Sequence, residues 1–363
     1  MRLGVAVALV DGELLAGDVE IDALGTVVEV GIGAGVGTLL AVPGLIDLQI
    51  NGVAGVDLRI AERDGYRIAA AALAGRGATA VQPTFHSQSL PAHVDSLRRL
   101  GEVRADPPPG CRILAAHLEG PFLAPDRRGA HDRQHLLAPD AAVLRRLLAA
   151  GPVGMMTLAP ELDPACGLIG DLVRSGVVAS IGHTDATAQQ VHAAVVAGAR
   201  HVTHVWNAQR PITARDPGPV GVALSEPLLT VGLIADLVHV SAEVVVLTAA
   251  AAAGRLAATT DSVAVVGDVT ERVGGGAAST SGVTLADGTL AGGTAMPDAC
   301  LRNLVSVGVP LAAAVDACGG AQRRLLGVPS VRLVPGERAE MVVLADDLRP
   351  VRTVIGTAVF EPA

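Results

Sequence analysis

The sequence predicts an α/β fold, a (β/α)8 barrel of the TIM type with a small β domain formed by both termini. Three observations predict it. Short β-branched apolar runs alternate with alanine-rich stretches from about residue 43 onward. These runs are nearly continuous, as in parallel strands that helices cover on both faces. Both ends of the chain instead alternate apolar and polar residues, so we expect a β-sandwich domain over 1–42 plus 331–363 and the barrel over 43–330.

The barrel strands are expected where β-branched and other apolar residues run together between turn residues. In chain order these runs are LIDLQI (45–50), ATAVQPTF (78–85), RILAAHLE (112–119), VGMMTLAP (153–160), VVASIGHT (177–184), HVTHVWNA (201–208), LLTVGLIAD (228–236) and SVAVVGD (262–268). Helices rich in Ala and Leu are expected at 66–73, 94–100, 141–148, 168–174, 189–196, 244–257, 298–305 and 311–326. Asp11-Gly12 is the expected turn of an N-terminal hairpin.

Composition narrows the class of protein. Half of the 363 residues are apolar and 17% are charged, so the chain can bury a large core. A net charge of −9 argues against a nucleic-acid partner or an anionic membrane surface. The uncharged run 30–46 contains glycines and a proline and does not fit a spanning helix. With no signal-peptide pattern and four scattered cysteines, we expect a cytoplasmic protein without a disulfide framework.

The chain contains no lysine, because all 27 basic residues are arginine. This excludes a Schiff-base lysine, a pyridoxal-phosphate anchor and a phosphate-loop lysine. It also excludes a carbamylated lysine that bridges two metal ions. Any phosphate must therefore be bound by arginine, histidine or backbone groups.

Polar residues end the expected strands, where the chemistry of such barrels is found. They are Gln49, Asn51, Glu119, His183, His204, Asn207, Asp236, His239 and Asp268. One carboxylate and two imidazoles, from Glu119, His183 and His204, form a set suited to Zn²⁺ or Fe²⁺. A single histidine at a strand end is more often structural than a metal ligand, but the coincidence of several favours a site. Asp268 could then take a proton from the metal-bound water.

Several segments resemble the N-acetylglucosamine-6-phosphate deacetylase family of the amidohydrolase superfamily. They are PGLIDLQINGVAGVD (43–57), HLEGPFLAPDRRGAH (117–131), SIGHTDAT (180–187), HVTHVWNAQRPITARDPGPVG (201–221), IADLVHV (234–240) and PGERAEMVVLADD (335–347). The resemblance implies a metal-dependent hydrolase that converts N-acetylglucosamine 6-phosphate to glucosamine 6-phosphate and acetate.

By position, the resemblance implies that Glu119, His183 and His204 bind the metal and that Asp268 and His131 are catalytic. The implied substrate-binding residues are Gln49, Asn207, Ala208, Arg215 and His239. Gln49 and Asn51 match the branch of the family that holds one divalent metal per subunit, Zn or Fe. The resemblance also implies a homodimer in which Arg215 reaches the neighbouring subunit's phosphate.

The chain departs from the family pattern near the expected acetyl and sugar pocket. Gly267-Asp268-Val269 stands for the usual Thr-Asp-Ala, and Gln209 replaces the methionine that usually follows Asn-Ala. Two alternatives therefore stay open: an amidohydrolase acting on another N-acyl amino sugar or a cyclic amide, and a catalytically silent sugar-phosphate-binding homologue.

Overall fold

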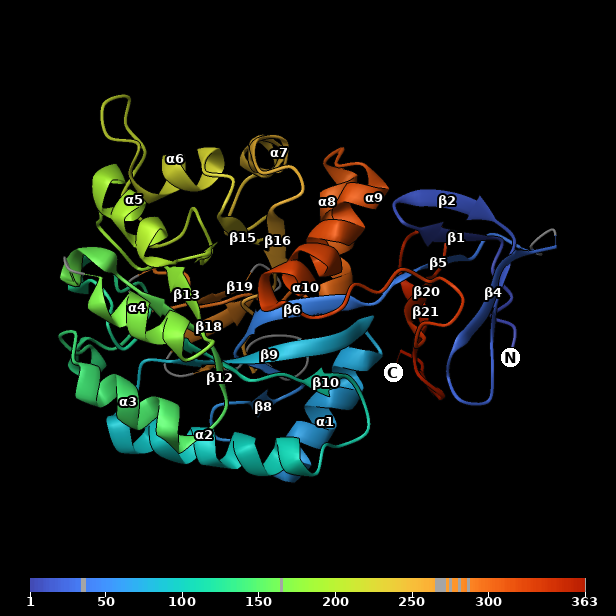
Figure 1. Cartoon of the computed structure of the whole chain (residues 1–363), viewed down its shortest axis with the longest axis horizontal. Coiled ribbons are helices and arrows are strands. Elements are labelled where there is room, and N and C mark those ends of the chain that lie inside the picture. Colours follow the sequence, from blue (N-terminus) through green and yellow to red (C-terminus); the bar gives the residue numbers. More distant parts are fainter. Residues whose placement is uncertain are drawn as a thin grey trace.

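A computed structural model describes residues 1–33, 37–163, 166–264, 272–273, 276–279, 282–285 and 288–362. Figure 1 shows a barrel surrounded by helices and, at one end of it, a smaller β unit that contains both chain termini. The predicted (β/α)8 barrel with a β unit built from both termini is confirmed. The division at residues 42/43 and 330/331 stays a prediction.

Within the described residues, eight parallel strands form the barrel. They are β6 (Leu45–Ile50), β9 (Ala78–His86), β11 (Ala116–Glu119), β12 (Val153–Leu158), β13 (Val178–Ile181), β14 (His201–Val202), β15 (Thr230–Ile234) and β16 (Leu256–Thr259). A hydrogen bond of 2.9 Å from the Asp261 N–H to the Gln49 carbonyl joins β16 to β6 and closes the barrel. The short strand β10 (Arg112–Ile113) pairs with β9.

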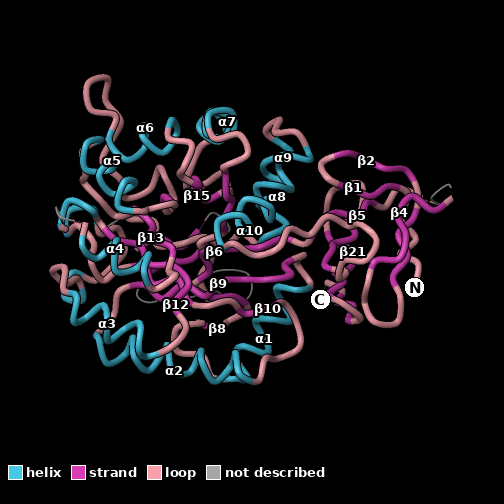
Figure 2. Tube along the Cα trace, in the orientation of Figure 1, coloured by secondary structure: helices cyan, strands magenta, loops and turns pink. Residues whose placement is uncertain are grey.

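Helices surround the strands (Figure 2). They are α1 (Arg63–Ala74), α2 (Leu90–Ala105), α3 (Ala141–Ala150), α4 (Gly167–Arg174), α5 (Ala188–Ala197), α6 (Gly218–Ser225), α7 (Ala242–Ala251), α8 (Pro297–Ser306), α9 (Leu311–Val315) and α10 (Ala321–Leu326). A π-helical turn, Asp316–Gly320, joins α9 to α10. Local signals fix several ends: a capping box of Thr187 and Gln190 begins α5, and left-handed Gly198 ends it. No helix of the described part has both the length and the apolar character to span a bilayer.

Both termini contribute to one six-stranded sheet with the order β2-β1-β5-β20-β21-β22. Its strands are β1 (Val7–Val10), β2 (Glu13–Ala16), β5 (Leu40–Pro43), β20 (Glu340–Leu344), β21 (Pro350–Ile355) and β22 (Ala358–Phe360). The hairpin of β3 (Asp18–Ile21) and β4 (Val27–Ile32) shares a separate apolar core with this sheet. The smaller strands are β7 (Gly52–Val53), β8 (Val56–Asp57), β17 (Arg272–Val273), β18 (Gly276–Ser279) and β19 (Gly282–Thr284).

The eighth barrel strand was predicted at 262–268, and the structure places it earlier in the chain; residues 265–268 lie outside the described residues. The eighth strand is β16, which spans Leu256–Thr259 and overlaps the end of the helix expected at 244–257. Its sequence, LAAT, is alanine-rich, and alanine favours a helix. Parallel pairing with β15 overrides that preference, because all four residues of β16 are buried in the barrel wall.

Candidate active site

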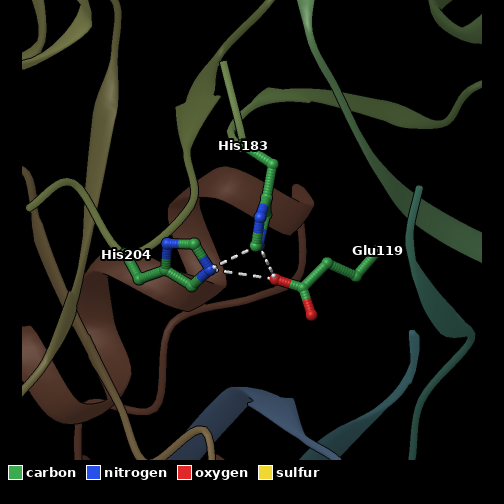
Figure 3. A group of neighbouring side chains, drawn as sticks. All are labelled: Glu119, His183 and His204. Atoms are coloured by element: carbon green, nitrogen blue, oxygen red, sulfur yellow. Dashed lines mark hydrogen bonds and ion pairs between the residues drawn. The ribbon is translucent and has the colours of Figure 1, made fainter. Parts of the chain in front are cut away.

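Three side chains converge at the carboxyl-terminal mouth of the barrel (Figure 3). Glu119 ends β11, and His183 and His204 follow β13 and β14. The Nε2 atoms of His183 and His204 lie 3.1 and 2.9 Å from Glu119 Oε1 and 3.1 Å from each other. The structure thus brings together the three residues that the sequence predicted as metal ligands, and all three are buried.

Backbone carbonyls orient both imidazoles. His183 Nδ1 lies 2.9 Å from the Arg127 carbonyl, and His204 Nδ1 lies 3.1 Å from the Asn207 carbonyl. Because a carbonyl oxygen only accepts, each Nδ1 carries the proton that it donates. Each Nε2 therefore directs a lone pair toward Glu119, which is the tautomer that a metal-binding histidine requires.

The geometry and chemistry of this set fit a divalent cation. Ligand atoms at about 2.0–2.1 Å from a tetrahedral metal lie about 3.3 Å apart, close to the distances between these three atoms. Burial alone would raise the pKa of Glu119, but its contacts with His131, His183 and His204 hold it well below its usual value. Burial alone would lower the pKa of His204, and the negative charge of Glu119 outweighs it and raises that pKa. The site therefore favours a positive charge at its centre.

Asp261 follows the last strand of the barrel and lines the same cavity. Its Oδ1 accepts hydrogen bonds of 2.8 Å from Asn51 Nδ2 and 3.2 Å from Gln49 Nε2. Gln49 Nε2 also donates to Glu119 Oε1 at 3.0 Å, so one amide connects the triad to Asp261. Burial and, to a smaller extent, the negative charge of Glu119 raise the pKa of Asp261 to about 7.

The sequence pattern indicated Asp268, which lies outside the described residues, and did not indicate Asp261. The sequence did contain a signal for Asp261, because Thr260-Asp261-Ser262 has the Thr-Asp pair of the usual family pattern, Thr-Asp-Ala. The incorrect placement of the eighth strand over 262–268 moved the expected strand end from Asp261 to Asp268.

His131 lies beside the triad, with its Nε2 3.6 Å from Glu119 Oε2. The backbone N–H of Ser87 donates to His131 Nδ1 at 3.2 Å. Since Nδ1 accepts, the neutral ring carries its proton on Nε2, which faces the triad. His131 can therefore offer a hydrogen-bond donor to an oxygen atom bound there.

The triad opens into a cavity of about 620 Å³. On the side of β14 and β15, the predicted residues Asn207, Ala208 and His239 line it. His239 Nδ1 lies 2.6 Å from Asp236 Oδ2, and both side chains are almost completely buried. Arg215 is exposed and does not line this cavity.

Two further lining residues were not foreseen. On the side of β6 and β9, Arg59 and His86 line the cavity. Arg59 donates to His86 Nε2 at 2.7 Å and to Asp57 Oδ2 at 3.1 Å. Burial and, to a smaller extent, the charge of Arg59 lower the pKa of His86 to about 3, so this histidine is neutral.

Comparisons with known proteins give the family of the chain. No protein-family model matches the chain. An N-acetylglucosamine-6-phosphate deacetylase from Bos taurus is 33% identical over 339 residues, which cover 88% of this chain and 82% of the relative. An N-acetylgalactosamine-6-phosphate deacetylase from Escherichia coli is 33% identical over 318 residues, 85% of this chain and 84% of the relative.

A solved structure is similar over nearly the whole chain. It is an Asp-to-Ala mutant of the N-acetyl-D-glucosamine-6-phosphate deacetylase of Mycobacterium smegmatis, in complex with N-acetyl-D-glucosamine-6-phosphate. The TM-score is 0.92, with 33% identity and 99% of each chain covered. The chain described here therefore belongs to the N-acetylglucosamine-6-phosphate deacetylase family, a family of hydrolases in the amidohydrolase superfamily.

Proposed function

We propose that the chain hydrolyses the acetamide of N-acetylglucosamine 6-phosphate to glucosamine 6-phosphate and acetate. The observation that carries this proposal is the convergence of Glu119, His183 and His204 with Asp261 in one cavity. The relatives with this activity in their names cover most of both chains, which supports the same substrate class.

Glu119, His183 and His204 would hold one divalent cation, Zn²⁺ or Fe²⁺. When bound, such an ion supplies Lewis acidity, which lowers the pKa of a water molecule and polarises a carbonyl group. Gln49 holds Glu119 Oε1 through its side-chain amide and so orients one of the three ligands. In this proposal Gln49 positions the ligands, because it does not line the cavity.

Asp261 is proposed as the acid/base residue in place of Asp268. Its carboxylate accepts a proton from the attacking water and returns it to the nitrogen of the departing amino sugar. Burial raises the pKa of Asp261 toward neutrality, which suits a group that must both accept and release a proton. The Nε2–H of His131 donates to the acetyl oxygen as that atom gains negative charge.

The sugar phosphate is proposed to lie against Asn207, Ala208 and His239. Asp236 Oδ2 holds His239 Nδ1 by a 2.6 Å contact and so fixes the orientation of the imidazole at the wall of the cavity. We also propose a homodimer in which Arg215, exposed and outside its own cavity, binds the phosphate of the neighbouring subunit. A cytoplasmic location is proposed because all four cysteines are free and buried.

The test measures acetate release from N-acetylglucosamine 6-phosphate and from unphosphorylated N-acetylglucosamine, with metal content determined on the same sample. We expect a bound divalent metal and a clear preference for the phosphorylated sugar. His239→Gln should raise KM for the phosphorylated sugar and leave the slow reaction of the unphosphorylated one unchanged. Bound metal with no hydrolysis of any acetylated sugar phosphate would instead support the silent binder.

A second candidate is the same reaction on another N-acyl amino sugar. The Escherichia coli relative with a galacto-configured substrate in its name is also 33% identical to this chain. Comparing kcat/KM for the two epimers and for longer N-acyl groups distinguishes the candidates.

A further inference from the structure

A buried carboxylate lies beneath the catalytic end of the last strand. Asp47, on β6, is 1% exposed, and both of its oxygens accept hydrogen bonds. Thr259 Oγ1 donates to Oδ1 and Thr260 Oγ1 to Oδ2, each at 2.5 Å. The backbone N–H of Gln49 donates to Oδ1 at 3.0 Å, and that of Thr260 donates to Oδ2 at 3.3 Å. Asp47 thus binds the two residues that directly precede Asp261.

Asp261 has an unusual backbone conformation, which the hydrogen bonds between Asp47 and Thr260 stabilise. Its φ is +47°, in the left-handed region that costs conformational energy for a residue with a Cβ. The hydroxyl of Thr260, which donates to Asp47, also accepts a hydrogen bond of 3.1 Å from the Ser262 N–H. The Thr260 hydroxyl therefore links Thr260 and Ser262, the two residues that flank Asp261 in the chain. The N–H of Asp261 itself is held by the Gln49 carbonyl at 2.9 Å.

We propose that Asp47 is a positioning residue that acts through the Thr260 hydroxyl to aim the Asp261 carboxylate at the metal triad. This inference rests on the proposed function, in which Asp261 moves the proton. Asp47 lies outside the cavity lining, so its effect would pass through the backbone of β16 and not through contact with substrate.

The geometry gives a reason why a carboxylate lies at this position. A buried carboxylate is costly unless it is fully hydrogen-bonded, and Asp47 is bonded by two hydroxyls and two backbone N–H groups. Both hydroxyls come from one strand end, and that end carries the proposed acid/base residue. If Asp47 served barrel closure alone, the hydroxyl of Thr260 would matter for stability and not for turnover.

Thr260 offers a matched pair of variants. Thr260→Val replaces the hydroxyl with a methyl group of nearly the same size, whereas Thr260→Ser keeps the hydroxyl. We expect Thr260→Val to lower kcat by about 10- to 100-fold, since small displacements of a catalytic group have effects of this size. KM and metal content should change little. Thr260→Ser should restore most of the turnover, and Asp47→Asn should resemble Thr260→Val.

Asp18 provides a control for lost stability alone. It is a buried aspartate in the terminal β unit, and its carboxylate accepts hydrogen bonds from the N–H groups of Gly4, Val5 and Val19. Asp18→Asn should lower the melting temperature without lowering kcat at a temperature where the variant is folded.

Two results would overturn the inference: wild-type kcat in folded Thr260→Val, or equal losses of kcat in the valine and serine variants. A parallel measurement on Asp261→Asn separates this failure from failure of the proposed function. If Asp261→Asn is inactive while Thr260→Val is fully active, only the positioning role of Asp47 is refuted. If Asp261→Asn retains wild-type turnover, the proposed role of Asp261 is refuted, and the inference with it.

Discussion

Replacing Asp261 by asparagine tests the proposed chemistry with little change in shape. The Oδ1 atom of Asp261 accepts from the side-chain amides of Asn51 and Gln49, and the carbonyl oxygen of an asparagine can accept the same two hydrogen bonds. The amide NH2 then takes the place of Oδ2. This group cannot accept a proton, so Asp261→Asn removes proton transfer and keeps the neighbouring contacts.

The expected loss follows from that difference. A positioned acid/base residue contributes about 10²- to 10⁴-fold to a reaction rate. At 1.36 kcal/mol for each tenfold change, this corresponds to about 3–5 kcal/mol of transition-state stabilisation. The ligands Glu119, His183 and His204 are untouched, so metal content should stay at the wild-type level. KM should change much less than kcat, because the residues proposed to bind the sugar phosphate follow other strands, β14 and β15.

The assay is steady-state acetate release from N-acetylglucosamine 6-phosphate, with metal content measured on each preparation. Asp268→Asn is the matched comparison, since the sequence pattern named Asp268 for the same role. We expect Asp261→Asn to lose at least about a hundredfold in kcat and Asp268→Asn to lose little. The opposite result, an active Asp261→Asn and an inactive Asp268→Asn, would refute the assignment of Asp261, which rests on its position after β16. Asp268 would then be the acid/base residue.

Three further measurements test the site and the fold. Glu119→Gln should lower metal affinity by at least about tenfold, and undiminished occupancy after dialysis would contradict its role as a ligand. Glu340→Leu should lower the free energy of unfolding by about 3–5 kcal/mol, because it leaves the buried guanidinium of Arg323 without its partner at 2.8 Å; a loss below about 1 kcal/mol, the scale of an exposed pair, would contradict this. Burial lowers the pKa of His93 to about 4 from 6.5, so the unfolded chain binds that proton more readily. Stability from neutral His93 should therefore be present above pH 6.5 and fall toward pH 4, by at most about 1.4 kcal/mol per pH unit, and His93→Gln should flatten this dependence in urea unfolding.

The barrel is predictable from the sequence because seven of its strands are apolar runs bounded by turns. The prediction fails at β16, where LAAT has no β-branched residue until its last position. The neighbouring SVAVVGD has the stronger β pattern, yet Val263 and Ala264 lie beyond the strand. Local preference could not show that the alanines of β16 fill the barrel wall beside β15, because that contact depends on tertiary packing.

The direction of the site side chains also lies beyond what a sequence pattern reveals. His183, His204 and Asp261 each follow a strand and adopt a positive φ, of 48°, 27° and 47°. A regular strand would continue in a straight line, with successive side chains on opposite faces. The positive φ turns the chain at each strand end, which is compatible with three side chains that face one cavity. Asp and His are among the non-glycine residues that tolerate this region best. Asp and His thus suit both the chemistry of the site and the left-handed backbone at these strand ends. Mutations that change this backbone conformation should therefore lower turnover more than they lower the stability of the fold.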